Sequence, residues 1–279
     1  MAVTRNDITK AVRELGVTRG SVVMVHSSFK SLGEVEGGAE TVIGGFLDAI
    51  GEQEGTLVLP TFVSKDFANA YKTWYMDKPS DTGYLTEYFR KREGSVRSDQ
   101  ATHSVAAYGK YAKEITATHG HTHKRFGNFG DTPFSADSPF AKMYELNGKI
   151  ITLGCGALYL TYRHYAEYLY MEKELKSIEK HPDYQKMKDQ LWSFGKKGVW
   201  PHTNNMVAAD IMRDMGLLYS TTCGNAELLC VPVKEFVDML VERLENYDPI
   251  VLRRDELWDT DAWIEWTVRV REMRKELAK

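Results

Sequence analysis

The sequence has few of the features that mark several common protein classes. Its three cysteines are odd in number and form no Cys-x-x-Cys pair, which argues against a disulfide framework and favours a reducing compartment. No apolar run approaches the roughly 20 residues of a membrane span, and the first residues lack the apolar core of a signal peptide. The formal net charge of −3 implies no general attraction to nucleic acid. We therefore expect a cytoplasmic protein without a nucleic-acid or membrane partner.

The clearest pattern in the chain is a strand–helix–strand unit near its start. Val22–Val25 and Thr56–Leu59 are short apolar runs typical of buried strands. Between them, apolar residues recur with the spacing of a helix that buries one face; they are Ala39, Val42, Ile43, Phe46, Leu47 and Ile50. Two strands joined in this way are parallel. Because strand and helix patterns alternate further along the chain, the sequence predicts an α/β fold with a mixed, mostly parallel central sheet and helices on both faces.

We expect residues 1–279 to form a single domain, with residues 250–279 as a C-terminal helical extension. An apolar stripe with heptad-like spacing runs along that extension. Its members are Trp263, Trp266, Val270, Met273 and Leu277. Large apolar groups on a charged helix need a partner surface, which is either the chain's own core or a second subunit. We predict a homodimer through this helix, with packing on the chain's own core as the alternative.

The loop between the first strand and the helix has the features of an anion-binding site. Ser27 and Ser28 leave the strand end, and Gly33, Gly37 and Gly38 let the backbone bend where a Cβ would clash. Because two glycines directly precede the helix, free N–H groups and the positive end of the helix dipole point into this loop. The simplest ligand is a phosphate group. A glycine-rich connection without a ligand is the alternative.

A second group of polar residues follows a later predicted strand. Thr161, His164 and Glu167 are spaced three apart, so on a helix a hydroxyl and a carboxylate can flank the imidazole. They come after Gly154-Cys155-Gly156 at a strand end, where open α/β sheets bind ligands. An imidazole beside a carboxylate suits a general base near neutral pH. The alternatives are a purely structural histidine, and Glu227 in place of Glu167 as its partner.

Two other features have a chemical interpretation and a simpler one. His119, His121 and His123 alternate in a glycine-rich segment, and such a cluster can ligate zinc. No carboxylate or cysteine lies nearby at a ligand spacing, so a loop without metal is the favoured interpretation. Cys155, between two glycines, is interpreted as a small buried hydrophobic residue rather than a nucleophile.

Several spaced motifs together resemble the aminoglycoside N3-acetyltransferase family, which has the antibiotic N-acetyltransferase fold and not the GNAT fold. The likeness covers most of residues 20–245. The motifs are His26-Ser27-Ser28-Phe29, Leu32-Gly33, Val35, Gly37-Gly38-Ala39, Gly55-Thr56-Leu57-Val58-Leu59-Pro60-Thr61-Phe62, Arg97-Ser98, Ser104–Gly109, Ser138-Pro139-Phe140 and Thr161-Tyr162-Arg163-His164-Tyr165-Ala166-Glu167.

This resemblance implies an acetyl-CoA-dependent N-acetyltransferase that uses no metal and acts on a primary amine, foremost the 3-amino group of an aminoglycoside. It implies His164 as the catalytic base, with Thr161 and either Glu167 or Glu227 beside it. The residues implied for acetyl-CoA binding are Ser27, Ser28, Phe29, Leu32, Gly33, Val35, Gly37, Gly38, Arg97, Ser98 and Ser104. The last three either help to hold the CoA arm or satisfy backbone groups.

The chain departs from the family pattern in one segment. Where the family usually has Arg-Ser-x-His-Pro, this chain has Arg97-Ser98-Asp99-Gln100-Ala101. The segment borders the expected acceptor site, so the identity of the amine stays open. The alternatives are an amino-phosphonate or amino-sugar intermediate as acceptor, a metal-dependent hydrolase that uses His119, His121 and His123, and a CoA-binding protein without activity.

Overall fold

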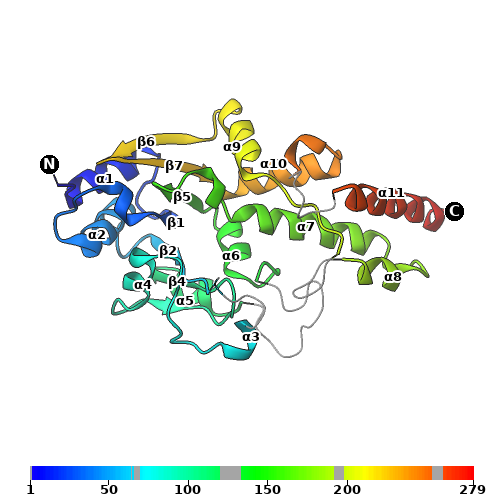
Figure 1. The fold of residues 1–279 in the computed structure, drawn as a ribbon, viewed down its shortest axis with the longest axis horizontal. Helices are drawn as coiled ribbons and strands as arrows, with labels where there is room; N and C mark the ends of the chain where they lie inside the picture. The colour runs from blue at the N-terminus through cyan, green and yellow to red at the C-terminus, as the bar shows by residue number, and fades with distance from the viewer. Residues whose placement is uncertain (1, 64, 66–69, 120–132, 192–197, 253–259) are drawn as a thin grey trace.

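A seven-stranded sheet lies at the centre of the molecule and has helices on both faces (Figure 1). The computed structural model describes residues 2–63, 65, 70–119, 133–191, 198–252 and 260–279. The strand order in the sheet is β3-β4-β2-β1-β5-β7-β6. The strands are β1 (Val22–Ser27), β2 (Thr56–Pro60), β3 (Val96–Arg97), β4 (Val105–Gly109), β5 (Lys149–Leu153), β6 (Tyr219–Cys223) and β7 (Ala226–Pro232).

Strand direction changes between the centre of the sheet and its edges. The central strand β1 pairs in parallel with β2 and with β5. Outside this centre, β4 and β7 run antiparallel to their neighbours, and the edge strands β3 and β6 turn back again. The link from β6 to β7 is only Gly224-Asn225, and so short a link joins antiparallel strands. The predicted mixed α/β sheet is confirmed, but the expectation that it is mostly parallel is wrong: β1 pairs in parallel with β2 and β5, whereas the other four pairings of the described strands are antiparallel.

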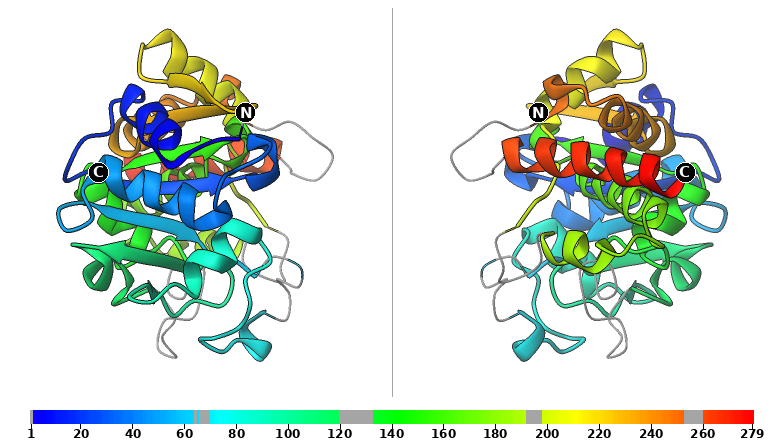
Figure 2. Two further views of the ribbon diagram at one scale, coloured as in Figure 1. Left: turned by 90° about the vertical axis from the view of Figure 1, so that its left-hand side faces the viewer. Right: turned by 90° about the vertical axis from the view of Figure 1, so that its right-hand side faces the viewer.

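The helices form a layer on each face of the sheet, and α11 lies outside one of these layers (Figure 2). Residues of α1, α2 and α4 form the core on one face, and residues of α5, α6, α7, α9, α10 and α11 belong to the core on the other. No described helix is long and apolar enough to cross a membrane. The α-helices are α1 (Arg5–Glu14), α2 (Gly38–Ile50), α3 (Ala70–Thr73), α4 (Tyr84–Arg90), α5 (Ala112–Thr116), α6 (Pro139–Glu145), α7 (Tyr162–Ser177), α8 (Tyr184–Asp189), α9 (Asn205–Asp214), α10 (Val233–Glu245) and α11 (Thr260–Leu277), and the 3₁₀ turns are η1 (Phe29–Leu32), η3 (Ala157–Tyr159) and η4 (Pro249–Val251).

The central strand explains why there are two hydrophobic cores. Alternate side chains of a strand point to opposite faces of its sheet. Val23 and Val25 accordingly pack with the helices of one face, and Val22 and Met24 pack with those of the other. Both faces are covered, which is why β1 reads as an uninterrupted apolar run. By the same alternation, His26 lies on the face of Met24, toward α7.

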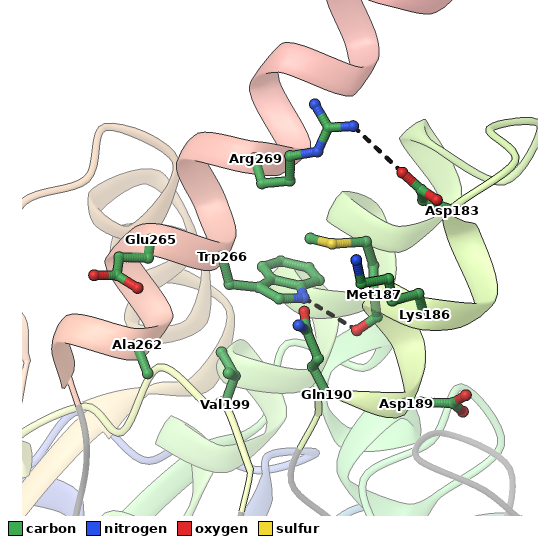
Figure 3. A pocket seen from close by; sticks show the side chains of 10 residues that line it. All are labelled: Asp183, Lys186, Met187, Asp189, Gln190, Val199, Ala262, Glu265, Trp266 and Arg269. Carbon is green, nitrogen blue, oxygen red and sulfur yellow. Dashed lines mark hydrogen bonds and ion pairs between the residues drawn. The ribbon is translucent and has the colours of Figure 1, made fainter.

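The apolar stripe of α11 packs against the chain itself. Four of its five members are buried, namely Trp263, Trp266, Val270 and Met273. The indole Nε1 of Trp266 donates a hydrogen bond to the backbone oxygen of Met187 in α8, 3.1 Å away (Figure 3). Each such buried side chain contributes about 1.5–3 kcal/mol of transfer free energy. Because the chain's own core covers these residues, the stripe gives no support to the predicted homodimer.

Candidate active site

Polar side chains gather at one edge of the sheet. The parallel strands β1, β2 and β5 end there, at Ser27, Pro60 and Leu153. The antiparallel strands β4 and β7 begin at the same edge, because Val105 pairs with Pro60 and Leu228 pairs with Leu153. This carboxyl edge of the parallel strands is where open α/β sheets bind ligands. The candidate site is therefore built from segments far apart in the sequence.

The loop after β5 is pressed against the loop after β1. Gly154 has a φ of +65°, and a Cβ on it would lie 1.7 Å from Oγ of Ser31, so only glycine fits there. Its N–H donates to the carbonyl of Glu227 at 2.7 Å. The chain then passes through η3 to α7, whose start is joined to β1 by a hydrogen bond of 2.9 Å between Oγ1 of Thr161 and Nε2 of His26.

Glu167, near the start of α7, is a buried carboxylate with many hydrogen-bond donors. Its Oε1 accepts from Nη1 of Arg163 at 3.0 Å and from the backbone N and hydroxyl of Thr203 at 2.8 and 2.7 Å. Its Oε2 accepts from Nε1 of Trp200 at 3.0 Å and from His164. Burial by itself raises the pKa of this carboxyl group, but the charge of Arg163 and the nearby histidines hold it well below its ordinary value. Glu167 is therefore ionised at neutral pH.

His164 lies on the same face of α7, where its Nδ1 is 3.1 Å from Oε2 of Glu167. Because an ionised carboxylate only accepts hydrogen bonds, Nδ1 carries the proton and Nε2 carries the lone pair. The side chain is 31% exposed. Burial and the charge of Arg163 lower the pKa of His164 below its ordinary value of 6.5, although Glu167 acts in the opposite direction. The imidazole is thus neutral at pH 7, as a general base requires.

The other two residues grouped with His164 lie elsewhere. The hydroxyl of Thr161 bonds to His26 instead of flanking the base. Glu227 alternates with buried neighbours on β7, so its side chain is exposed, and its backbone carbonyl accepts from Gly154. Of the two carboxylates considered, Glu167 is the one in contact with the imidazole.

Aromatic rings from separate segments surround His164. The ring centroid of Phe134, before α6, is 5.3 Å from that of His164, and the centroid of His103, before β4, is 6.4 Å from it. Phe62, after β2, lies between His103 and His26, with centroid distances of 4.6 and 6.4 Å. Burial lowers the pKa of His26 to about 4, so this ring is neutral at pH 7. The imidazole of His164 thus faces a largely apolar wall.

The start of α2 is open to a ligand. Gly37 is the N-cap of α2 and has a φ of +75°, and Gly38 follows with a φ of +65°. A Cβ on Gly38 would meet no atom of the described residues within 4 Å. The first N–H groups of a helix lack partners within it, so this surface can hold a phosphate group.

The remaining loop residues expected to bind acetyl-CoA are held by the core or the strand end. Leu32 is buried, and Phe29 and Val35 pack partly against the core of the α2 face. Ser27 is the last residue of β1 and Ser28 follows it, and both are half-buried. Gly33 has a φ of +84°, and a Cβ on it would lie 2.9 Å from the side chain of Asn225. These residues fix the path of the loop that presents the start of α2.

Arg97 and Ser104 are engaged within the protein. The guanidinium group of Arg97 donates from Nε to the hydroxyl of Thr61 at 3.1 Å, from Nη1 to the carbonyl of Met76 at 2.8 Å, and from Nη2 to the carbonyl of Thr61 at 2.8 Å. The hydroxyl of Ser104 also donates to that carbonyl of Thr61, at 2.9 Å. Burial lowers the pKa of Arg97 to about 10. This geometry favours the alternative in which these side chains satisfy backbone groups.

His119 is hydrogen-bonded through both ring nitrogens. Nε2–H donates to the carbonyl of Pro133 at 3.0 Å, and Nδ1 lies 2.6 Å from the hydroxyl of Ser98, which donates to it. This histidine would have to break a hydrogen bond to ligate a metal. His121 and His123 lie outside the described residues. Over the described ranges, no group of three or more His, Cys, Asp or Glu side chains is arranged to hold a metal ion.

A sequence profile of the aminoglycoside 3-N-acetyltransferase family matches residues 24–245. The chain belongs to this family. Aminoglycoside N(3)-acetyltransferase VII of Streptomyces paromomycinus is 32% identical to it over 188 residues. That alignment covers 60% of this chain and 61% of the relative, so the matched part spans about three fifths of the relative's length. The predicted acyltransferase family is confirmed.

Solved structures of the aminoglycoside acetyltransferases share the fold. The apoenzyme AAC(3)-IVa has a TM-score of 0.71 at 21% identity, over 95% of this chain and 98% of that one. AAC-IIIb in a binary complex with CoASH has a TM-score of 0.65 at 18% identity, over 88% of this chain and 98% of that one. The predicted fold, distinct from GNAT, is confirmed.

A separate hollow of about 480 Å³ lies between α8 and α11 (Figure 3). Its lining mixes acidic and basic side chains around the indole of Trp266, and Arg269 is paired with Asp183 at 3.4 Å. No residue of the group around His164 lines it. The chemistry of the side chains places the candidate site at the sheet edge and not in this hollow.

Sequence reasoning missed several residues that surround the base. Arg163 stands four residues before Glu167, an i,i+4 pair that helix spacing could have revealed. Trp200 and Thr203 are 33 and 36 residues beyond Glu167 and carry no local signal of the contact. His26 stood in a family motif, but its hydrogen bond to α7 becomes visible only in the fold.

Proposed function

We propose that this chain transfers the acetyl group of acetyl-CoA to a primary amine, and that the amine is the 3-amino group of an aminoglycoside. The observation that carries the proposal is the contact of His164 with Glu167, 3.1 Å long, which leaves Nε2 as a base at the ligand-binding edge of the sheet. Membership of the aminoglycoside 3-N-acetyltransferase family supports the type of reaction. The complex of the related AAC-IIIb with CoASH supports the acetyl donor.

In the proposed step, the lone pair of the amine nitrogen attacks the thioester carbon and the carbon–sulfur bond breaks. Nε2 of His164 takes the proton that the nitrogen loses, and this proton then passes to the sulfur of the leaving CoA. Glu167 stabilises the imidazolium ion while it exists. Glu167 does not take the proton itself, because its pKa lies well below its ordinary value.

Acetyl-CoA is proposed to lie along residues 27–38, with its diphosphate at the start of α2. Gly38→Val places side-chain bulk on the open backbone there, and we expect the affinity for acetyl-CoA to fall at least about tenfold, or about 1.4 kcal/mol. Gly216→Val is the matched control, because Gly216 also has a positive φ, +71°, and no described atom within 4 Å of a Cβ. If calorimetry finds that both variants bind acetyl-CoA with equal affinity, the phosphate groups bind elsewhere.

The reaction is tested by release of CoA thiol from acetyl-CoA with a panel of amines. The panel contains several aminoglycosides, an amino-phosphonate and a simple amino sugar, and we expect the aminoglycosides to be acetylated. If a polycationic acceptor is steered by carboxylates, kcat/KM falls steeply from low to physiological ionic strength, as charges beyond ~8 Å are screened. Thiol release with the amino-phosphonate but with no aminoglycoside would retain acetyl transfer and reject the aminoglycoside as acceptor.

Location and assembly belong to the same proposal. We place the activity in the cytoplasm because acetyl-CoA is an intracellular metabolite. The homodimer predicted from the α11 stripe stays a prediction without support from the described residues. Light scattering at micromolar concentration decides it, because a mass near the 31.8 kDa of the chain means a monomer.

A further inference from the structure

A second imidazole stands beside the proposed base. His103 is half-buried just before β4, and its ring lies between those of Phe62 and Phe134, with centroid distances of 4.6 and 4.9 Å. The centroid of the His164 ring is 6.4 Å from it, with the two ring planes at 70°. His103 therefore lies at the same sheet edge as the base, and the proposed acetyl transfer has so far given it no role.

The turn that presents His103 is fixed by the side chain of Gln100. The amide oxygen Oε1 of Gln100 accepts from the backbone N–H groups of Thr102 and His103, at 2.7 and 2.6 Å. Two backbone donors identify this atom as the oxygen and not the nitrogen of the amide. Gln100 and Thr102 are both completely buried. The segment in which this chain departs from the family pattern thus holds the second imidazole in place.

The same network determines which nitrogen of His103 carries the proton. The hydroxyl of Thr102 lies 3.0 Å from Oε1 of Gln100, and since an amide oxygen only accepts, the hydroxyl donates its one proton there. The oxygen of Thr102 is also 2.9 Å from Nδ1 of His103, so Nδ1–H must donate to it. Nε2 of the neutral ring therefore carries a lone pair.

We propose that His103 binds the acceptor amine by accepting one of its N–H groups at Nε2. This inference rests on the proposed function and extends it to the acceptor site. A neutral primary amine has two N–H groups and one lone pair. If His164 accepts one N–H and His103 accepts the other, the nitrogen is held by two imidazoles and its lone pair points at the thioester carbon. Burial holds the pKa of His103 well below its ordinary value, and the pKa of His164 is also lowered, so both rings stay neutral at pH 7.

Steady-state kinetics with acetyl-CoA and the best amine of the panel test this role. His103→Phe keeps a ring of similar shape between Phe62 and Phe134 but has no acceptor atom. We expect the KM for the amine to rise at least about tenfold, with the KM for acetyl-CoA unchanged. His103→Gln offers an amide oxygen near the place of Nε2 and should recover most of the loss. A merely structural histidine would instead change both KM values together with the melting temperature, and Gln would not rescue it.

Nitrogen NMR of the imidazoles gives a readout that does not depend on turnover. We expect the His103 signals of the Nδ1–H tautomer, and Thr102→Val, which removes the acceptor of that proton, should release the ring from it. The Nε2–H tautomer in wild type would overturn the inference. A KM for the amine in His103→Phe equal to that of wild type would also overturn it and leave the proposed function standing. No thiol release by wild type with any amine would reject both together.

Discussion

Helix α7 carries two buried glutamates, two turns apart, whose pKa values move in opposite directions. Glu167 accepts hydrogen bonds from four residues and remains ionised, next to the half-exposed imidazole of His164. Glu174 is paired with Arg274 of α11, and burial outweighs this pairing, so its pKa is raised above the ordinary value of 4.5. The comparison shows that the number of donors around a buried carboxylate, more than its depth, decides in which direction its pKa moves.

The two halves of α7 also differ in what surrounds them. The first half reaches the edge of the sheet where the parallel strands end, which is where open α/β sheets bind ligands. The second half is covered by α11, whose Arg274 also donates from Nε to the hydroxyl of Ser177 at 2.7 Å. Near this second half, His181 and Glu276 form another histidine–glutamate pair, 2.8 Å apart. The same residue types thus occur as a candidate catalytic pair and as a structural pair, and variants can separate the two.

The largest effect is expected for the base. His164→Ala removes the proton acceptor, and we expect turnover to fall by ~10²–10⁴, the usual contribution of general acid–base help. Binding of acetyl-CoA, measured by calorimetry, should be nearly intact. The matched control is His181→Ala in the structural pair, which should retain full turnover. If the turnover of His164→Ala stays within threefold of wild type, His164 is a structural residue, and the two histidine–glutamate pairs do not differ in function.

A smaller loss is expected when the charge beside the base is removed. Glu167→Gln weakens a hydrogen bond to a charged group, worth about 1.5–3 kcal/mol, so turnover should fall roughly 10–100-fold. Because Glu167 raises the pKa of His164, the acid limb of the pH–rate profile should also move to lower pH. Glu174→Gln should change neither turnover nor the profile. A profile that stays in place in Glu167→Gln would mean that the carboxylate does not act on the base.

One donor to Glu167 can be deleted with its ring retained. Trp200→Phe loses the indole N–H that lies 3.0 Å from Oε2 of Glu167. One hydrogen bond of about 0.5–1.5 kcal/mol corresponds to a fall in turnover of roughly threefold to tenfold. Trp266→Phe deletes the corresponding indole N–H at the α8–α11 contact and should lower only the free energy of unfolding. Equal turnover in the two variants would show that Trp200 has no effect on the base through Glu167.

The smallest effect concerns stability and pH, and it has opposite signs for the two glutamates. A raised pKa means that folded Glu174 holds its proton more tightly than the unfolded chain, so its contribution is lost as pH rises above 4.5. A lowered pKa means that Glu167 contributes stability above pH 4.5 and loses it as pH falls. Urea unfolding should therefore show Glu174→Gln gaining relative to wild type as pH rises above 4.5, and Glu167→Gln gaining relative to wild type as pH falls below 4.5. The same slope for both variants would contradict the comparison.

Local spacing made much of the fold and part of the site predictable. The strand–helix–strand unit at 22–60 followed from apolar runs and a helical stripe, since both periodicities are properties of neighbouring residues. The contact of His164 with Glu167 could also be predicted from the sequence, because residues three apart share a helix face. The stripe of α11 was visible for the same reason, but the surface that covers it was not.

The choice among partners was decided only by the tertiary structure. Sequence spacing left Glu167 and Glu227 equal as partners of the base, and strand alternation in the folded sheet turned Glu227 to solvent. Trp200 reaches Glu167 across 33 residues, and His26 reaches Thr161 across 135. The amino-acid sequence by itself determined the elements and the residue types at their ends. The contacts among those residues depended on where distant segments of the chain return to the sheet edge. No local periodicity in the sequence encodes these positions.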